Sequence, residues 1–72
     1  MSSVSLNSPV QGVVIALEAA VGDVVAAGRA VAVIESMKME MPVEAEDEGT
    51  VREILCEEGQ AVNEGDTLVV LE

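Results

Sequence analysis

The sequence has no histidine and no aromatic residue, and it has one cysteine, Cys56, among 72 residues. Without histidine a transition-metal site is not expected, and no imidazole is available to activate Cys56 as a nucleophile. We interpret Cys56 as the filler of a small site. A lone cysteine cannot form an intramolecular disulfide, so the fold does not depend on an oxidising compartment. The missing aromatic rings also remove stacking platforms for bases and sugars.

Basic residues are scarce as well, with three Lys and Arg against fourteen Asp and Glu and a net charge of −11. This charge repels nucleic acid and favours solubility or a partner with a basic surface. No apolar run approaches the roughly 20 residues that span a bilayer, and the first residues lack the features of a secretory signal. We expect a cytoplasmic protein that is a monomer in isolation, with no nucleic-acid or membrane partner.

The length corresponds to a single domain, residues 1–72, too small to be expected to enclose a deep active site. Abundant valine and spaced glycines favour strands over helices.

Aligned with itself at an offset of 37 residues, the chain repeats without a gap, which gives halves of about 4–36 and 39–72. The pairs that coincide include Gly12 with Gly49, Gly22 with Gly59, Gly28 with Gly65 and Glu35 with Glu72.

Each half is predicted to contain three strands preceded by one extended segment. The predicted strands are 13–17, 23–25 and 30–36 in the first half and 50–55, 60–62 and 67–71 in the second, with extended segments at 4–6 and 39–45. Glycines 22 and 28 argue against a helix in the Ala- and Val-rich stretch 16–32. Two related four-stranded units, each with one apolar face, most simply bury those faces against each other. The prediction is an all-β, eight-stranded flattened barrel or sandwich.

Residues 39–46 alternate with period two, as in a half-buried strand. The inward set is Met39, Met41, Val43 and Ala45, and the outward set is Glu40, Pro42, Glu44 and Glu46. Proline on the outward set suits an edge strand, where no ladder hydrogen bond is lost.

Lys38 is the only lysine, and it lies at a predicted hairpin turn that joins the two halves and has no counterpart at the end of the second half. The simplest interpretation is a solvated lysine. Methionine on both sides favours a functional role, because exposed apolar side chains offer soft contacts to a partner. We expect Met39 to belong to the core and Met37 to be exposed for recognition.

The segment Glu35-Ser36-Met37-Lys38-Met39-Glu40 resembles the biotin-attachment motif of biotinyl domains, the biotin carboxyl carrier proteins. The glycine-spaced frame agrees over essentially all of residues 4–72. The resemblance implies a barrel-sandwich hybrid in which biotin is attached to Lys38 by a biotin protein ligase, with Met37 and Met39 flanking the modified residue. It further implies a non-catalytic carrier that moves a carboxyl group between a biotin carboxylase site and a carboxyltransferase site.

The chain departs from this family pattern at three places. Met41 replaces a polar residue of many relatives, Glu46 replaces a proline, and no room exists for the "thumb" insertion of some bacterial carriers. We expect a free-standing carrier or an excised terminal domain, with an acceptor that the sequence does not specify.

Three rival interpretations stay open at the level of the sequence. Lipoyl domains share the fold but usually have an acidic residue before the lysine and a small one after it, so Met37 and Met39 favour biotin. An unmodified structural or adaptor domain is the second rival. A stand-alone enzyme is the least favoured, because no activated nucleophile or metal site is visible in the sequence.

Overall fold

The computed structural model describes residues 3–72, and within this range it contains eight strands and no helix. Each strand begins and ends within one residue of its predicted bounds. The strands are β1 (Val4–Asn7), β2 (Gly12–Leu17), β3 (Val24–Val25), β4 (Ala30–Ser36), β5 (Met39–Glu44), β6 (Gly49–Ile54), β7 (Ala61–Val62) and β8 (Thr67–Leu71). The predicted all-β fold is confirmed.

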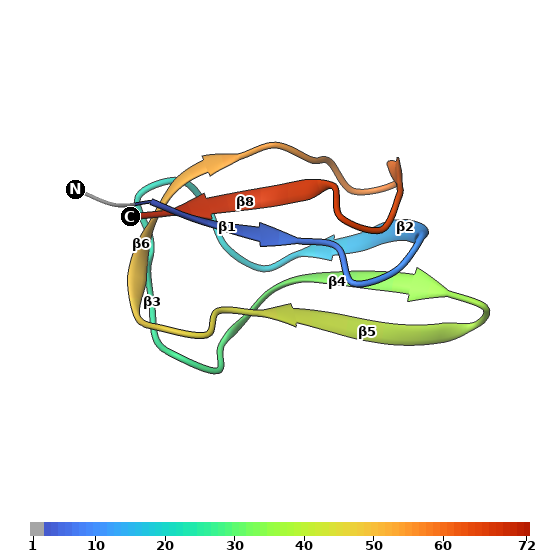
Figure 1. Ribbon diagram of the computed structural model, residues 1–72, viewed down its shortest axis with the longest axis horizontal. Coiled ribbons are helices and arrows are strands. Elements are labelled where there is room, and N and C mark those ends of the chain that lie inside the picture. Colours follow the sequence, from blue (N-terminus) through green and yellow to red (C-terminus); the bar gives the residue numbers. More distant parts are fainter. Residues whose placement is uncertain (1–2) are drawn as a thin grey trace.

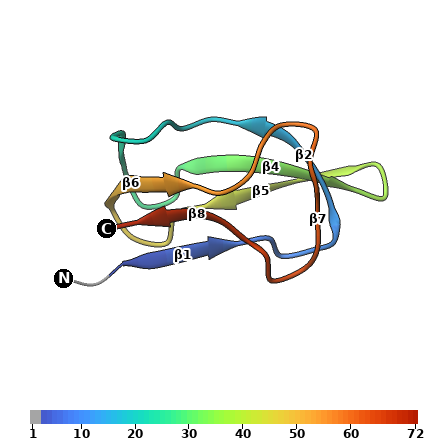
Figure 2. The same cartoon turned by 90° about the horizontal axis from the view of Figure 1, so that it is seen from above.

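The strands form two antiparallel four-stranded sheets that face each other, with orders β1-β8-β6-β3 and β5-β4-β2-β7 (Figures 1 and 2). Each sheet takes two strands from each sequence half, so the halves interlock. The simpler picture of one half packing against the other is therefore wrong. Interlocking lets every long strand of one half pair with a strand of the other.

Backbone hydrogen bonds repeat with the same 37-residue offset as the sequence. The Gly22 N–H donates to the Val51 carbonyl (2.8 Å), and the Gly59 N–H donates to the Val14 carbonyl. Strand bulges also coincide, because the register of β2 against β4 shifts between Val14 and Ala16 and that of β6 against β8 shifts between residues 51 and 53. The repeat seen in the sequence is thus a repeat of backbone geometry.

The core between the sheets is aliphatic. Its largest fully buried side chains are Ile34, Leu68, Val14, Val25, Val31, Val51 and Val69. In the part of the chain that the structure describes, one polar residue, Ser8, is buried with them, and its hydroxyl donates to the Val10 carbonyl (2.6 Å). The hydroxyl therefore keeps a hydrogen bond inside an apolar environment, which avoids the cost of an unpaired buried polar group.

Four turns share one construction: a backbone hydrogen bond from the fourth residue to the first, with a glycine at positive φ in third place. These glycines are Gly22, Gly28, Gly59 and Gly65, with φ of 96°, 86°, 90° and 90°. The left-handed region favours glycine because other residues have a Cβ atom that clashes there. This explains why these glycines recur at matched positions.

The molecule measures 36 × 17 × 17 Å along its principal axes. The β4–β5 hairpin forms one end of the long axis, while β1 begins and β8 ends at the opposite end (Figures 1 and 2). None of the described residues forms a helix long and apolar enough to cross a membrane. The residues that connect β4 and β5 therefore lie at the end of the molecule opposite the C-terminus (Figure 1).

Candidate functional site at the hairpin tip

The tip of the β4–β5 hairpin is a two-residue turn. Strand pairing continues to its end, where Ser36 lies opposite Met39, and only Met37 and Lys38 connect the strands. Both connecting residues have positive φ, 53° and 67°. Positive φ at both central residues is the geometry of a type I′ turn, whose twist matches that of the flanking strands.

Glycine or asparagine normally occupies such a turn, so Met37 and Lys38 are unusual there. A left-handed conformation costs a residue with a Cβ atom about 1–2 kcal/mol. Backbone strain of this kind persists where the surrounding structure enforces it, and it gathers at functional sites. The strained turn is therefore a reason, independent of any motif, to place the functional site at this tip.

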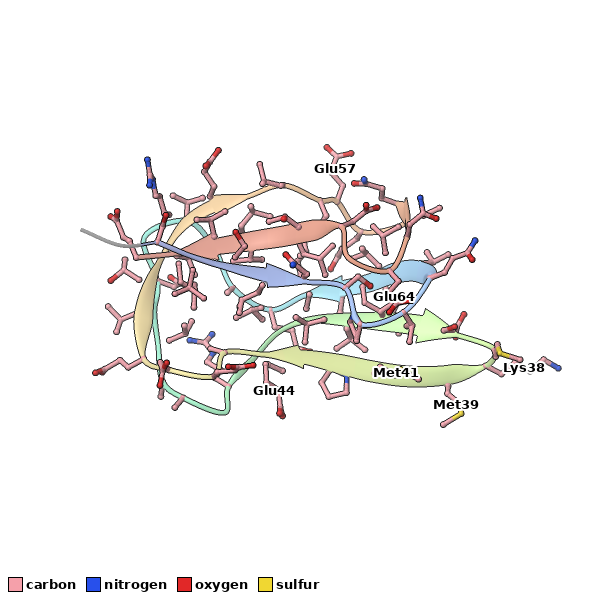
Figure 3. All side chains as sticks on the ribbon, in the orientation of Figure 1. Lys38, Met39, Met41, Glu44, Glu57 and Glu64 are labelled. Carbon is pink, nitrogen blue, oxygen red and sulfur yellow. The ribbon has the colours of Figure 1, made fainter. Side chains whose placement is uncertain are left out.

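Lys38 is exposed, and its side chain extends from the tip away from the body of the molecule (Figure 3). Its amine is therefore accessible to an approaching enzyme. The backbone beneath it is held by the pairing of β4 with β5. The arrangement combines a fixed base with a mobile, accessible amine.

The two methionines beside Lys38 are both exposed. Met37 is 91% exposed, as predicted, but Met39 is 61% exposed, so the prediction that Met39 belongs to the core is wrong. The tip extends beyond the facing sheet (Figure 1), and the Met39 side chain points away from the body of the molecule (Figure 3). The inward set of β5 begins at the half-buried Met41 and continues with the buried Val43. Pro42 is exposed on an edge strand, as predicted.

Two glutamates frame the tip on one face of the hairpin. Glu35 of β4 and Glu40 of β5 lie directly opposite each other, and both are exposed. Like charges at directly opposite positions destabilise a sheet. The pair therefore makes no evident contribution to folding, although it surrounds the attachment candidate with negative charge.

An open hollow lies at the base of the tip, lined by Gln11, Gly12, Val13, Glu35, Ser36 and Met37. It does not enclose the Lys38 amine. A smaller hollow lies at the other end of the molecule, lined by residues that include Val4, Leu6, Gly49 and Leu71. Among residues 3–72, the tip thus presents a side chain outward, and the hollow at its base is open and is not lined by Lys38.

Cys56 is buried, with 5% of its surface exposed, as its interpretation as a core filler predicts. Burial raises the pKa of its thiol above the ordinary value of 9.0, because the thiolate loses solvation there. A buried thiol with a raised pKa is a poor nucleophile. Cys56 therefore takes no part in the site.

Comparisons with known proteins agree with this geometry. Residues 4–71 match the Biotin_lipoyl family model, which is described as "Biotin-requiring enzyme". The chain belongs to the biotin/lipoyl attachment family. This membership confirms the family predicted from the sequence, the biotin cofactor and the general role of a carrier domain.

Individual relatives of this biotin/lipoyl attachment domain differ greatly in length. It is 48% identical over 67 residues to the mitochondrial propionyl-CoA carboxylase alpha chain of Homo sapiens, covering 93% of this chain and 9% of the relative. It is 50% identical over 50 residues to the biotin/lipoyl attachment protein of Bacillus subtilis (strain 168), covering 69% of this chain and 68% of that protein. The domain thus spans less than a tenth of the first relative and about two thirds of the second.

Among solved structures, the Kluyveromyces lactis urea carboxylase contains a region similar to this biotin/lipoyl attachment domain. The TM-score is 0.93 and the identity is 40%, over 100% of this chain and 6% of that one. The similarity over the whole chain confirms the predicted fold of two four-stranded sheets.

The sequence identified Lys38, Met37 and Met39, and the structure brings all three together at one tip. Sequence reasoning missed two features of the site: the strain of the turn and the position of Glu35 directly opposite Glu40. Both follow from the register of the hairpin. A turn of two residues between residues 36 and 39 was the signal that could have predicted the type I′ geometry.

Proposed function

We propose that the protein is a biotin carboxyl carrier in which Lys38 is the attachment residue. It serves a biotin carboxylase site and a carboxyltransferase site on partner proteins or on other domains. The observation that carries this proposal is the exposure of the only lysine at the end of a strained two-residue turn. Membership of a biotin-requiring family supports the choice of cofactor.

The residues present fit a covalently attached biotin. Attachment needs one accessible amine and no enclosing pocket, and the outward direction of Lys38 leaves room for a bulky group (Figure 3). When bound, biotin supplies a nitrogen that can accept and release a carboxyl group. Met37 and Met39 offer exposed, polarizable side chains on both sides of the attachment point, which suits recognition by several partners.

Attachment is catalysed by a biotin protein ligase. In this step the Lys38 Nζ loses the proton of its ammonium form and attacks the carboxyl carbon of biotin, which has been activated with ATP. The C–N amide bond forms as the bond from that carbon to its leaving group breaks, Nζ gives up a second proton, and the chain gains the mass of biotin less one water. A lysine amine is protonated at neutral pH, so it must lose a proton before its nitrogen can act as a nucleophile. The ligase must therefore supply both the base and the activated carboxyl group, and the carrier itself is non-catalytic.

The carrier contributes position. Strands β4 and β5 fix the base of the arm while the lysine side chain moves, so the attached group stays at a high effective concentration near each site. Modification removes the positive charge of Lys38, so the net charge of the chain changes by one unit, from −11 to −12. The tip then carries only the two glutamates, which favours contact with basic surfaces.

A lipoyl carrier is the alternative with the same fold. The methionines at positions 37 and 39 favour biotin, because lipoyl domains usually have an acidic residue and a small residue there. The relatives named above include a propionyl-CoA carboxylase chain, and the structural neighbour is a urea carboxylase. Because these act on different acceptors, we assign the choice of acceptor to the transferase partner rather than to this domain.

Intact-mass measurement tests the proposal. The protein is co-expressed with a biotin protein ligase in one culture and with a lipoate ligase in another, each supplied with its cofactor. We expect a gain equal to biotin less one water in the first culture and no gain in the second. A gain only from lipoate would support the lipoyl carrier, and no gain in either culture would support an unmodified adaptor domain.

A further inference from the structure

The internal repeat allows each residue on the outer side of one sheet to be compared with its counterpart, 37 residues away, on the outer side of the other sheet. Positions that are 37 residues apart have the same strand pairing, so folding places the same backbone demands on both. Where their side chains differ in chemistry, the difference has a cause other than the fold.

The sheet that bears the hairpin has an apolar row across its outer side. Val33 of β4 lies opposite Ala16 of β2 and Pro42 of β5. Beside this row, Val13 and Ile15 of β2 are each 38% exposed. These five residues form a continuous strip, which we call the outer strip, on the side of the sheet that faces away from the core.

The corresponding row of the other sheet is polar. Val70 of β8, the counterpart of Val33, lies opposite Glu53 of β6 and Ser5 of β1. The counterparts of Val13 and Ile15 are Thr50 and Arg52. Four of the five positions of the outer strip are therefore polar or charged in the repeat, which shows that the fold does not require apolar residues there.

The chemical difference between the two sheets is clearest at one pair of counterparts. Ile15 and Arg52 are both the extra residue of a bulge, because the register shifts once between the residues that flank each of them. A bulge re-aims its side chain and is a feature of the backbone. The same bulge carries an exposed isoleucine in the sheet with Lys38 and an exposed arginine in the other.

Charged residues next to the outer strip indicate which kind of partner surface binds to it. The opposed Glu35 and Glu40 form the next row toward the tip, with Val13 directly opposite Glu35 on β2. A second copy of this chain would bring four such glutamates together, against a net charge of −11 on each copy. The strip therefore fits a protein surface that is apolar at its centre and has lysine or arginine beside it.

Of the three partners in the proposed function, only the ligase acts on Lys38 before biotin is attached. A ligase must bring its reaction centre to the Lys38 Nζ itself, within the length of one lysine side chain from the tip. The carboxylase and transferase sites are reached by a longer arm that already carries biotin. The ligase is thus the partner that must cover surface immediately beside the tip. The outer strip connects to the tip through the hollow shared by Val13, Glu35 and Met37.

We propose that the outer strip (Val13, Ile15, Ala16, Val33 and Pro42) is the docking face for the biotin protein ligase. This inference rests on the proposed function. The ligase presents an apolar patch to the strip and basic residues to Glu35 and Glu40. Lys38 then enters the reaction centre while the other sheet stays exposed to solvent.

Reciprocal substitutions test the docking face. Ile15→Arg places on the strip the residue that its counterpart already carries, and Arg52→Ile is the matched control on the other sheet. Val13→Thr and its control Thr50→Val make the same comparison without a change of charge. Each purified variant is biotinylated with ligase, ATP and biotin, and initial rates are measured over a range of carrier concentrations.

We expect Ile15→Arg to lower kcat/KM for labelling about tenfold, mainly by raising KM, and Val13→Thr to lower it less. Arg52→Ile and Thr50→Val should stay within about twofold of wild type.

Unfolding by urea shows whether each variant is folded, and Val13→Thr keeps the test valid if Ile15→Arg does not fold. A folded Ile15→Arg or Val13→Thr variant with wild-type KM would overturn the inference and leave the proposed function intact. Failure of the wild type itself to accept biotin would overturn the proposed function and, with it, the docking face.

Discussion

Gly12 of β2 packs so closely against Glu35 of β4 that a Cβ atom at residue 12 would overlap the Glu35 carbonyl oxygen and lie 2.9 Å from Ile34 Cγ2. At the counterpart, Gly49, the corresponding Cβ would lie 3.3 Å from the Glu72 carbonyl oxygen, a contact that small shifts can relieve. The close approach is thus found in the sheet that carries Lys38. It joins β2 to the strand that leads into the attachment turn.

This difference predicts unequal effects of the same substitution at the two repeat positions. Gly12→Ala should lower the free energy of unfolding by about 2–3 kcal/mol, because β4 must move to accept the methyl group. Gly49→Ala should cost less than about 1 kcal/mol. Urea unfolding curves for both variants provide the measurement. Equal losses of stability would show that the approach of β2 to β4 is no tighter than its counterpart.

The turn glycines predict a different kind of loss. A Cβ atom at Gly28 or Gly65 would meet nothing within 4 Å, yet both residues have positive φ. Gly28→Val or Gly65→Val should therefore destabilise the fold by about 1–2 kcal/mol through backbone conformation alone, with more effect on folding than on labelling chemistry. Gly65→Asn should lose less stability than Gly65→Val, because asparagine tolerates the left-handed region. Thermal unfolding distinguishes the two, and a valine variant as stable as wild type would contradict the turn assignment.

The strained attachment turn predicts a stabilising substitution. Met37 is 91% exposed and has a φ of 53°, so Met37→Asn removes little buried apolar surface and relieves strain. We expect the free energy of unfolding to rise by about 0.5–1 kcal/mol. Met39→Asn serves as the control, since Met39 is an exposed methionine of β5 without positive φ. If both variants change stability alike, strain at Met37 is not the cause.

Cys56 predicts a pH dependence of stability. Burial raises the pKa of its thiol above 9.0, so the folded protein keeps this proton at pH values where the unfolded chain has lost it. The contribution of the buried thiol is complete below the pKa of the unfolded state and is lost as the pH rises above it. We expect the stability of wild type to fall more steeply above about pH 9 than that of Cys56→Ala. Parallel stability profiles of the two proteins would contradict this.

The sequence was sufficient to predict the strands, because the repeat and the glycine positions constrain them twice. It also identified Lys38, since the chain has no other lysine. The exchange of strands between the halves could not be predicted, because the alternation of one strand does not say which strand lies beside it. Met39 was misplaced for a related reason: period two sets its side of the strand, but the length of the facing sheet decides whether that side is covered.

The carrier function depends on the attachment of biotin to the Lys38 amine at the exposed tip. Peptide mapping by tandem mass spectrometry, after co-expression with a biotin protein ligase, tests this most directly. We expect one biotin per chain on Lys38, and none on a Lys38→Arg variant that unfolds in urea like wild type, since a guanidinium group does not form the amide. Biotin at another position, or label retained by the Lys38→Arg variant, would contradict this expectation.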